Sequence, residues 1–249
     1  MVRHSDLYPK SAMPASSGRL IKAVGLPCLL WAAVLTMVPI VAAAHNISGA
    51  DARFVEGLSG SAIIPYMYLG AKHMVTGYDH LLYLVGVVFY LFRLKDIILY
   101  VSLFTLGHSI TLMGGVLLEW NVNAYLIDTI IGLSVAYKAF ENIDGFRRIF
   151  GFQFDSRVAV LIFGLFHGLG LATKLQDLSL SADSLVTNML SFNVGVEIGQ
   201  AIALTCIVVV LGQWRRSGSF IKQAFGANTV LMSLGFILAG YQFAGYLWA

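Results

Sequence analysis

Six long apolar segments dominate this chain, and they limit its fold more than any other feature. A transmembrane helix needs about 20 largely apolar residues, because it must cross a hydrocarbon layer roughly 30 Å thick. An additional apolar segment, Ser61–Met74, precedes the six and is predicted as a short or re-entrant helix. We predict membrane spans at Tyr78–Phe92, Ile97–Leu118, Ala124–Phe140, Arg157–Thr173, Ser184–Gly212 and Thr229–Trp248.

The composition excludes most soluble classes of protein. Only 12% of the 249 residues are charged, whereas a soluble domain carries roughly 25%. So few charges cannot cover a water-facing surface of this size, which excludes a disordered chain and a soluble enzyme. The net charge of +3 provides no basic surface for a nucleic acid. We therefore predict an all-α fold, a polytopic helical membrane bundle with six transmembrane helices after an N-terminal signal peptide.

Residues 1–44 have the pattern of a secretory signal peptide. A polar, basic segment precedes the apolar run Ala23–Ala44, which ends in small residues. Cleavage after Ala44 would leave residues 45–249 as a six-helix transmembrane domain. His45 would then be the first residue, and its α-amine and imidazole would be two metal ligands. In the alternative interpretations, the apolar run is an uncleaved first helix, or His45 merely follows the cleavage site.

Basic residues between the segments predict the orientation, because Lys and Arg are enriched in cytoplasmic loops. Alternate loops carry nine of them and the N-terminal segment adds four, whereas the opposite side has three, Arg53, Lys72 and Lys174. This asymmetry places the mature N-terminus and the C-terminus outside the cytoplasm. The larger group comprises Arg3, Lys10, Arg19, Lys22, Arg93, Lys95, Lys138, Arg147, Arg148, Arg157, Arg215, Arg216 and Lys222.

Ionisable side chains within the apolar segments are few, and in a membrane such residues are candidates for function. The first group, His73, Asp79 and His80, enters the first span from outside. An unbroken helix stacks His73 and His80 on one face, whereas a break at Gly77 would fold the three side chains together. Two imidazoles and a carboxylate are ligands for a first-row divalent metal ion. Alternatively, Asp79 and His80 form a hydrogen bond at the start of the helix and bind nothing.

Two further histidines lie deeper. His108 is in the middle of its span, and His167 lies beside Gly164 and Gly168. The G-x-x-x-G spacing of these glycines allows another helix backbone to approach closely. Either histidine could instead be a neutral packing residue bonded to a neighbouring helix.

A carboxylate is harder to explain as a packing residue. Asn193, Glu197 and Gln200 recur at spacings of four and three, so they share one helix face. Gly195 and Gly199 repeat the G-x-x-x-G spacing in the same segment. We expect His73, Asp79 and His80 to capture a metal ion at the outer face, and His108, His167 and Glu197 to relay it inward. Asp128, near the outer end of its span, is a weaker candidate.

The motifs around these residues resemble those of the HupE/UreJ family of bacterial membrane proteins. The resemblance covers roughly Gly70 to Gly212. It is carried by His73-x5-Asp79-His80-Leu-Leu-Tyr-Leu, Phe104-Thr-Leu-Gly-His108-Ser-Ile-Thr-Leu, Phe163-Gly-Leu-Phe-His167-Gly-Leu-Gly-Leu-Ala and Phe192-Asn-Val-Gly-Val-Glu197-Ile-Gly-Gln200.

The resemblance implies a signal peptide, six spans and a place in the bacterial inner membrane, with both mature termini on the periplasmic side. Family members are associated with uptake of nickel, and by extension cobalt, for hydrogenase and urease. The resemblance also implies that His73, Asp79 and His80 form the metal motif of a permease, and His167 matches a second histidine motif. The chain departs from the best-known nickel members in having one histidine there, and it has Asp128 where Glu is expected. It is therefore similar to a divergent branch.

We derive three hypotheses from these observations. The first is a secondary permease for a nickel- or cobalt-type cation, with the metal ion as its substrate and no nucleotide-binding motif. The second is a non-transporting accessory protein that binds copper or nickel for a neighbouring membrane enzyme. The third is an intramembrane enzyme or haem protein, for which the histidines are too few. The expected partners are the lipid bilayer, the metal ion, a metalloenzyme or its maturation system and further copies of the chain, but no nucleic acid.

Overall fold

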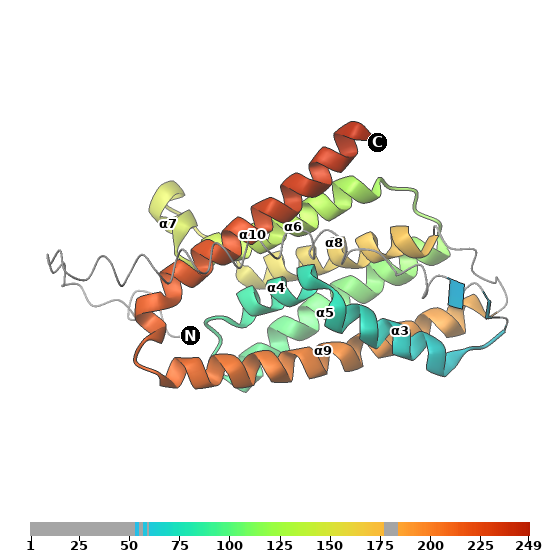
Figure 1. Cartoon of the computed structure of the whole chain (residues 1–249), viewed down its shortest axis with the longest axis horizontal. Coiled ribbons are helices and arrows are strands. Elements are labelled where there is room, and N and C mark those ends of the chain that lie inside the picture. Colours follow the sequence, from blue (N-terminus) through green and yellow to red (C-terminus); the bar gives the residue numbers. More distant parts are fainter. Residues whose placement is uncertain (1–52, 55–56, 59, 177–183) are drawn as a thin grey trace, which may run out of the picture.

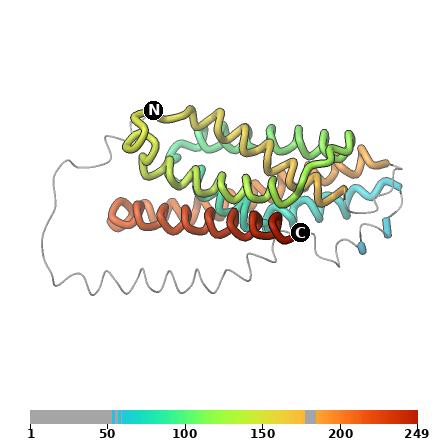
Figure 2. The backbone as a smooth tube through the Cα atoms, turned by 90° about the horizontal axis from the view of Figure 1, so that it is seen from above, coloured from blue at the N-terminus to red at the C-terminus, as the bar shows by residue number. Residues whose placement is uncertain are grey.

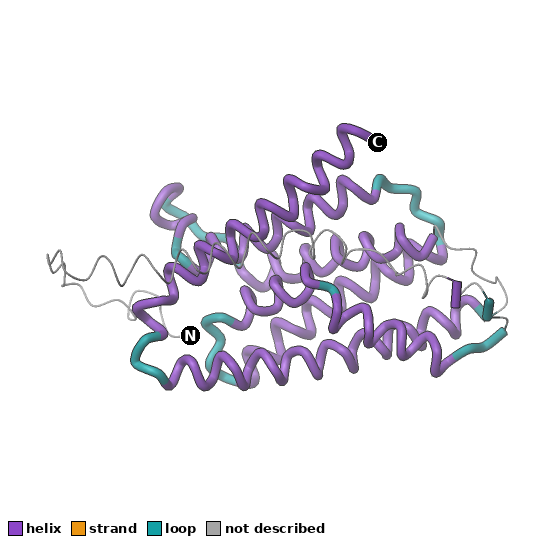
Figure 3. Tube along the Cα trace, in the orientation of Figure 1, coloured by secondary structure: helices purple, strands orange, loops and turns teal. Residues whose placement is uncertain are grey.

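The computed structural model describes residues 53–54, 57–58, 60–176 and 184–249, and the regular structure of this part is helical throughout (Figures 1 and 3). The predicted signal peptide, residues 1–44, and His45 lie outside the described residues. The principal helices of the described part are α3 (Ile63–Thr76), α4 (Tyr78–Val88), α5 (Leu94–Leu117), α6 (Ala124–Asn142), α7 (Gly145–Phe150), α8 (Ser156–Gln176), α9 (Leu185–Arg216) and α10 (Phe220–Trp248).

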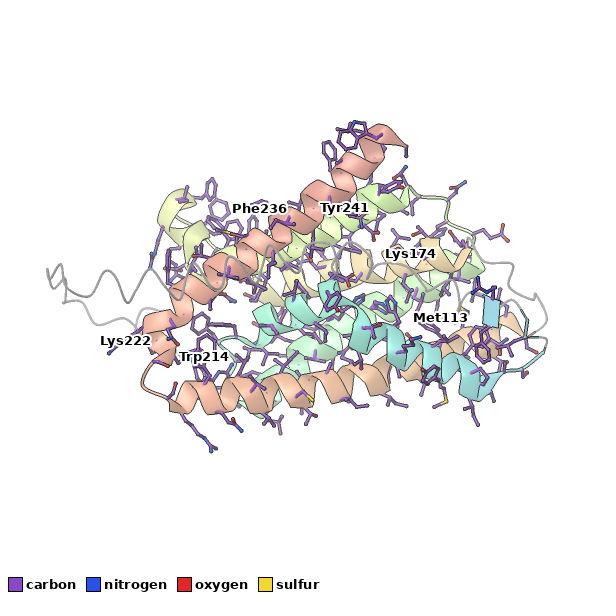
Figure 4. The ribbon with its side chains drawn as sticks, in the orientation of Figure 1. Met113, Lys174, Trp214, Lys222, Phe236 and Tyr241 are labelled. Carbon is purple, nitrogen blue, oxygen red and sulfur yellow. The ribbon has the colours of Figure 1, made fainter. Side chains whose placement is uncertain are left out.

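The long helices run along one axis of the molecule, so their termini gather at two opposite ends (Figures 1 and 2). The turns after α4, α6 and α9 lie at one end, which we call the basic end (residues 89–93, 143–155 and 217–219). The turn after α5 and the last residues of α8 and α10 lie at the opposite end. Trp214 and Lys222 flank the α9–α10 turn, and Lys174 lies far from them (Figure 4). The loops predicted to share one side of the membrane therefore share one end of the bundle.

Four helices in the described part of the chain are long and apolar enough to cross a membrane: α5, α8, α9 and α10. Helix α4 is apolar but has only 11 residues. Helix α6 has 19 residues and carries Asp128, Lys138 and Glu141, all of them buried. Large apolar side chains cover the outside of the bundle; Phe236 and Tyr241 on α10 are 56% and 54% exposed (Figure 4). The protein is therefore a helical membrane protein.

Each predicted span overlaps one of these helices, although all but α4 extend beyond the predicted bounds, and two further details differ from the sequence prediction. The short helix α7 was not predicted. Lys138 was counted among the loop cations, and this was wrong, because α6 continues to Asn142 and Lys138 is only 7% exposed. Its charge therefore belongs to the interior of the bundle and says nothing about orientation.

Helices pack in three close pairs, α5 with α8, α3 with α9 and α6 with α10, and glycines lie at each contact. A Cβ atom on Gly107 would lie 2.5 Å from the carbonyl oxygen of Leu161, and one on Gly235 would lie 2.5 Å from the amide nitrogen of Ala136. Real Cβ atoms do not come so close to backbone atoms, so only glycine permits these approaches. Van der Waals packing of this kind drives helix association in lipid.

Both predicted G-x-x-x-G pairs lie at these contacts. Gly164 and Gly168 of α8 pack against the backbone of α5, and Gly195 and Gly199 of α9 pack against that of α3. The close backbone approaches predicted from the two G-x-x-x-G spacings are therefore present.

Gly77 separates α3 from α4. Its backbone is extended, with φ −72° and ψ 101°. Its N–H donates to the His73 carbonyl at 2.8 Å and ends α3, whereas its carbonyl accepts from the Leu81 N–H at 3.0 Å and begins α4. A Cβ atom here would lie 3.1 Å from the Asp79 Oδ1 and His80 Nδ1 atoms, a tight contact. Of the two alternatives left open by the sequence, the break at Gly77 is the one that forms, and the unbroken helix does not.

Arg215 of α9 holds the C-terminal end of α4. Its guanidinium donates to the carbonyl oxygens of Val88 at 2.5 Å and Phe89 at 2.8 Å. It also donates to the Leu91 carbonyl at 2.9 Å and lies over the Phe92 ring, 4.6 Å from its centroid. The last carbonyls of a helix lack partners within it, and a cation is favourable there. This contact therefore anchors a helix that is too short to cross a bilayer by itself.

Gly235 and Gly240, both on α10, give a test of the close helix pairs. Gly235→Leu should destabilise the protein by about 1–3 kcal/mol, because its side chain would collide with the α6 backbone. Gly240→Leu is the matched control, since a Cβ atom there meets no atom within 4 Å. Thermal unfolding in detergent should show a lower midpoint for the Gly235 variant alone. Equal midpoints for both variants would contradict this packing.

Candidate metal centre

All four histidines in the described part of the chain meet in one cluster. The ring centroid of His80 lies 5.1 Å from that of His73, 5.0 Å from that of His167 and 5.6 Å from that of His108. Each residue comes from a different helix, α3, α4, α5 or α8. We call these four residues the histidine cluster. Segments far apart in the sequence therefore place four imidazoles within contact distance around His80.

The helix break at Gly77 brings the first two rings together. His73 lies in the last turn of α3, and His80 lies in the first turn of α4. In an unbroken helix, residues seven apart are roughly 10 Å apart along the axis. The observed ring separation is 5.1 Å. The extended backbone of Gly77 therefore folds the two imidazoles toward each other.

The close contact of α5 with α8 supplies the other two rings. A Cβ atom on Gly168 would clash with the carbonyl oxygen of His108, so the helices touch backbone to backbone at the level of both histidines. Thr111 of α5 strengthens the contact by donating to the Leu165 carbonyl at 2.6 Å. Because His167 immediately precedes Gly168, its ring lies beside the same contact.

The orientation of His167 is set by its own helix. Its Nδ1 lies 2.7 Å from the Phe163 carbonyl oxygen, which only accepts hydrogen bonds. Nδ1 therefore carries the hydrogen, and Nε2 carries the lone pair. Neither ring nitrogen of His108 forms a hydrogen bond with any described residue, although this side chain is only 1% exposed. Imidazole nitrogens with available lone pairs are ligands for borderline transition metals.

Asp79 adds a carboxylate to the cluster. It is 5% exposed, and its Oδ1 lies 3.1 Å from the Nδ1 of His80. A carboxylate beside an imidazole fixes the ring orientation and makes its other nitrogen a better ligand. The three residues predicted to capture metal, His73, Asp79 and His80, are therefore neighbours in the structure.

The ring spacing suits a shared metal ion, although the nitrogen atoms do not yet converge. Two imidazoles that bind one metal ion at about 2.0–2.1 Å have ring centroids roughly 5 Å apart. The separations around His80 are 5.0–5.6 Å. However, no group of three or more His, Cys, Asp or Glu residues in the described part is arranged to hold a metal ion as it stands. Binding would therefore require rotation of the side chains.

Aromatic rings pack against the histidine cluster. The Phe104 centroid lies 5.0 Å from that of His167 and 6.2 Å from those of His80 and His108. Tyr83 packs next to Phe104, with ring centroids 5.3 Å apart, and its ring centroid lies 5.2 Å from that of His167. These buried rings exclude water, so a metal ion in the cluster would have to exchange its hydration shell for protein ligands.

Glu197 does not join the histidine cluster, contrary to the sequence prediction. It lies five residues after Phe192, which contacts His73, and five residues correspond to about 140° around the helix axis. The Glu197 side chain is exposed and lines a separate groove between α5 and α9. The spacing of Asn193, Glu197 and Gln200 correctly placed them on one face, but that face is turned toward the groove.

Asp128 also lies apart from the histidines. It is 4% exposed rather than hydrated, and its Oδ2 lies 3.0 Å from the Nζ of Lys174. This ion pair joins α6 to the end of α8.

A second ion pair was missed by the sequence interpretation. The Nζ of Lys138 donates to Glu141 Oε2 at 2.7 Å, and both residues are buried in α6. Glu141 Oε1 also accepts a hydrogen bond from Ser156, at the start of α8. A charged pair three residues apart within an apolar run was the signal available in the sequence, and it was read as a loop instead.

Tyr83 and two asparagines lie near this ion pair. Tyr83, one helical turn beyond His80, is fully buried, and its hydroxyl forms no hydrogen bond with a described residue. Asn142 donates to the Gly86 carbonyl at 2.8 Å and to Asn228 Oδ1 at 2.9 Å. Polar groups therefore continue from the histidine cluster along α4 toward the basic end.

Comparison with known proteins identifies the family. No curated protein and no solved structure matches the chain. The model of the family described as HupE / UreJ protein matches residues 49–249, which include all four histidines of the cluster. Members of this family are membrane proteins of the transport type, not enzymes, and are associated with nickel and cobalt uptake for hydrogenase and urease. The chain therefore belongs to the HupE/UreJ family.

Proposed function

We propose that the protein is a secondary permease that carries a transition-metal cation, nickel or cobalt, across the bacterial inner membrane. The observation that carries the proposal is the meeting of four histidines from four helices at a helix break. In the proposed mechanism, His73, Asp79 and His80 capture the metal substrate, and His108 and His167 complete its coordination inside the bundle.

The chemistry of the ligands supports this choice of substrate. Imidazole suits nickel, cobalt, copper and zinc, whereas magnesium and calcium prefer oxygen ligands. A cluster with four imidazoles and a single carboxylate therefore favours the borderline metals over the more abundant hard cations. Copper has the same ligand preference, and the family association favours nickel or cobalt over it.

Six spans account best for the described helices. The four long apolar helices supply four of them. We propose α6 as a fifth, since its charged residues are paired and buried, and α3 with α4 as a sixth that is broken at Gly77. Broken helices are tolerated in membranes where they line a binding site, and transporters place their substrate sites at such breaks.

The basic turns support the proposed orientation. Without Lys138, the turns of the basic end still hold Arg93, Arg147 and Arg148, and Arg216 ends α9 directly before the last of these turns. Positive residues favour the cytoplasmic side, so the start of α3 and the end of α10 face the periplasm. The negative interior potential then favours inward movement of a divalent cation by roughly 4.6 kcal/mol per 100 mV.

The inner half of the route follows α4. Tyr83 lies between the histidine cluster and the Lys138–Glu141 ion pair, and its hydroxyl is available to a passing ligand. Glu141 is the next carboxylate after Asp79 in this direction. For the metal ion to pass, Glu141 would exchange Lys138 for the metal, which makes this ion pair the inner barrier of the proposed route.

The accessory-protein hypothesis predicts binding without transport, so transport must be measured separately from binding. It shares the histidine cluster with the permease hypothesis. A metalloenzyme or its maturation system remains the expected consumer of the metal under both hypotheses, and association of further copies of the chain stays a prediction.

His80→Ala should lower nickel affinity by at least roughly tenfold, because His80 contacts all three other rings and even outer-shell ligands contribute that much. Isothermal titration of nickel into purified protein measures binding, and nickel flux into proteoliposomes measures transport. Wild-type protein that binds nickel but shows no flux would support the accessory hypothesis instead.

Tyr78→Ala is the matched control, because Tyr78 lies on the same helix turn but is exposed. It should bind and transport nickel like the wild type. Wild-type nickel binding in the His80 variant would remove the histidine cluster from the mechanism.

Single cysteines should establish the orientation. In a background with Cys28 and Cys206 replaced by serine, Asn121→Cys lies in the α5–α6 turn and Gly218→Cys lies in the α9–α10 turn. A membrane-impermeant maleimide should label the Asn121 variant in intact cells and the Gly218 variant only after lysis. The reverse pattern would invert the proposed topology and the direction of uptake.

A further inference from the structure

A polar groove between α5 and α9 is not used by the proposed metal route. Its volume is about 540 Å³. Four of its polar lining residues contact each other across the two helices. Ser109 accepts a hydrogen bond from Asn193 at 2.8 Å, and Thr105 accepts one from Gln200 at 2.8 Å. These bonds tie the walls of the groove together, with Glu197 between them on α9.

Glu197 meets no compensating charge among the described residues that line this groove. Among the described residues the groove is lined by Val101, Ser102, Thr105, Leu106, Ser109, Asn193, Glu197, Gln200, Ala201 and Leu204, and Glu197 is the only ionisable one of these. Glu197 is the 13th residue of α9, about 18 Å from the start of a helix that crosses a hydrocarbon layer roughly 30 Å thick. An ionisable group at that depth needs a partner. An ionised Glu197 therefore requires an occupant of the groove that balances its one negative charge.

Gln200 points to the same conclusion independently. It is 3% exposed, and its Nε2 is held by Thr105, which fixes the orientation of the amide. Its Oε1 accepts no hydrogen bond from any described residue. A buried carbonyl oxygen without a donor is unfavourable. Glu197 and Gln200 are three residues apart on one helix face and both line the groove, so one occupant would adjoin both side chains.

We propose that this groove binds a sodium ion, held by the Glu197 carboxylate and the Gln200 Oε1, with the oxygens of Thr105, Ser109 and Asn193 nearby. Oxygen donors suit hard cations, and this set contains no imidazole. A monovalent ion fits because one carboxylate neutralises it, whereas a divalent ion would leave a net charge in the membrane. A protonated Glu197 would donate one hydrogen bond and would need only one acceptor. The groove instead has oxygen-bearing side chains on both of its walls.

The groove adjoins the histidine cluster through consecutive residues on two helices. On α5, His108 belongs to the cluster and Ser109 lines the groove. On α9, Phe192 contacts His73 and Asn193 lines the groove. A sodium ion that draws α5 and α9 together therefore acts on the backbone that positions His108. Sodium would be the coupling ion, a role that rests on the proposed metal transport, whereas sodium binding itself does not.

The binding test uses the purified full chain in detergent with radioactive sodium. The wild type should bind sodium saturably, and Glu197→Gln should weaken binding by roughly tenfold or more, as expected for loss of a charge-assisted contact. Gln200→Leu should weaken it as well. Glu119→Gln is the matched control, an exposed carboxylate in the α5–α6 turn, and should bind like the wild type.

Two outcomes would overturn the proposal. One is the absence of saturable sodium binding in the wild type, and the other is unchanged binding in Glu197→Gln. If Glu197→Gln abolishes a proton-driven nickel flux while no variant binds sodium, the groove is a proton site and the sodium assignment is wrong.

The coupling test keeps this proposal separate from the metal route. His80→Ala should bind sodium normally, and Glu197→Gln should bind nickel normally. An inward sodium gradient should stimulate nickel flux in wild-type proteoliposomes but not in those with Glu197→Gln. Sodium binding without nickel flux in the wild type would remove the permease hypothesis yet leave the sodium site standing, whereas nickel flux that ignores sodium would overturn the coupling role.

Discussion

Backbone contact between helices at glycine holds this protein together and positions its polar residues. Lipid tails are as apolar as leucine, so helices in a bilayer gain little from burying apolar side chains against one another and depend on close packing and interhelical hydrogen bonds. Gly168 lies against the carbonyl of His108, and Thr111 bonds across to Leu165. Wider separation of α5 and α8 would move His108 and His167 apart. The histidine cluster is therefore a consequence of helix packing rather than of a separately built loop.

The polar residues inside the bundle divide into two kinds. Asp128 with Lys174, and Lys138 with Glu141, form buried pairs whose charges cancel. Each charge is compensated by its partner, so these pairs are tolerated inside the bundle without a bound ligand. The histidine cluster is different, because it gathers several ligands of one type around His80 with a single carboxylate beside them. Structural pairing explains the first kind, but it does not explain four imidazoles in contact.

The sequence predicted the helices well because their signal is local. Runs of apolar residues mark a helix in lipid wherever its neighbours lie, so the predicted spans and the observed helices largely coincide. The sequence also offered the break at Gly77 as one of two alternatives, and only the structure shows that this break brings His73 and His80 together. The predicted position of Glu197 beside the histidines was wrong. The face of α9 that points into the bundle depends on how α9 packs against α3 and α5, which the sequence does not show. The assignment of Lys138 to a loop was wrong because the sequence does not show that Glu141 pairs with it inside the bundle.

On α5, the imidazole of His108 and the groove-lining hydroxyl of Ser109 belong to adjacent residues that face different ways, and this arrangement bears on how the two proposed sites would handle two cations. A site that mixed imidazoles with several oxygens would bind hard and borderline metals alike, and the more abundant hard ions would occupy it. Here the imidazoles face Phe104 and Tyr83 inside the bundle, whereas Glu197 and Gln200 face the groove outside it. Because His108 and Ser109 are consecutive, neither side can shift along the helix without the other. Chemical separation with mechanical connection is what coupled movement of two different ions requires, and the two faces of α5 provide both.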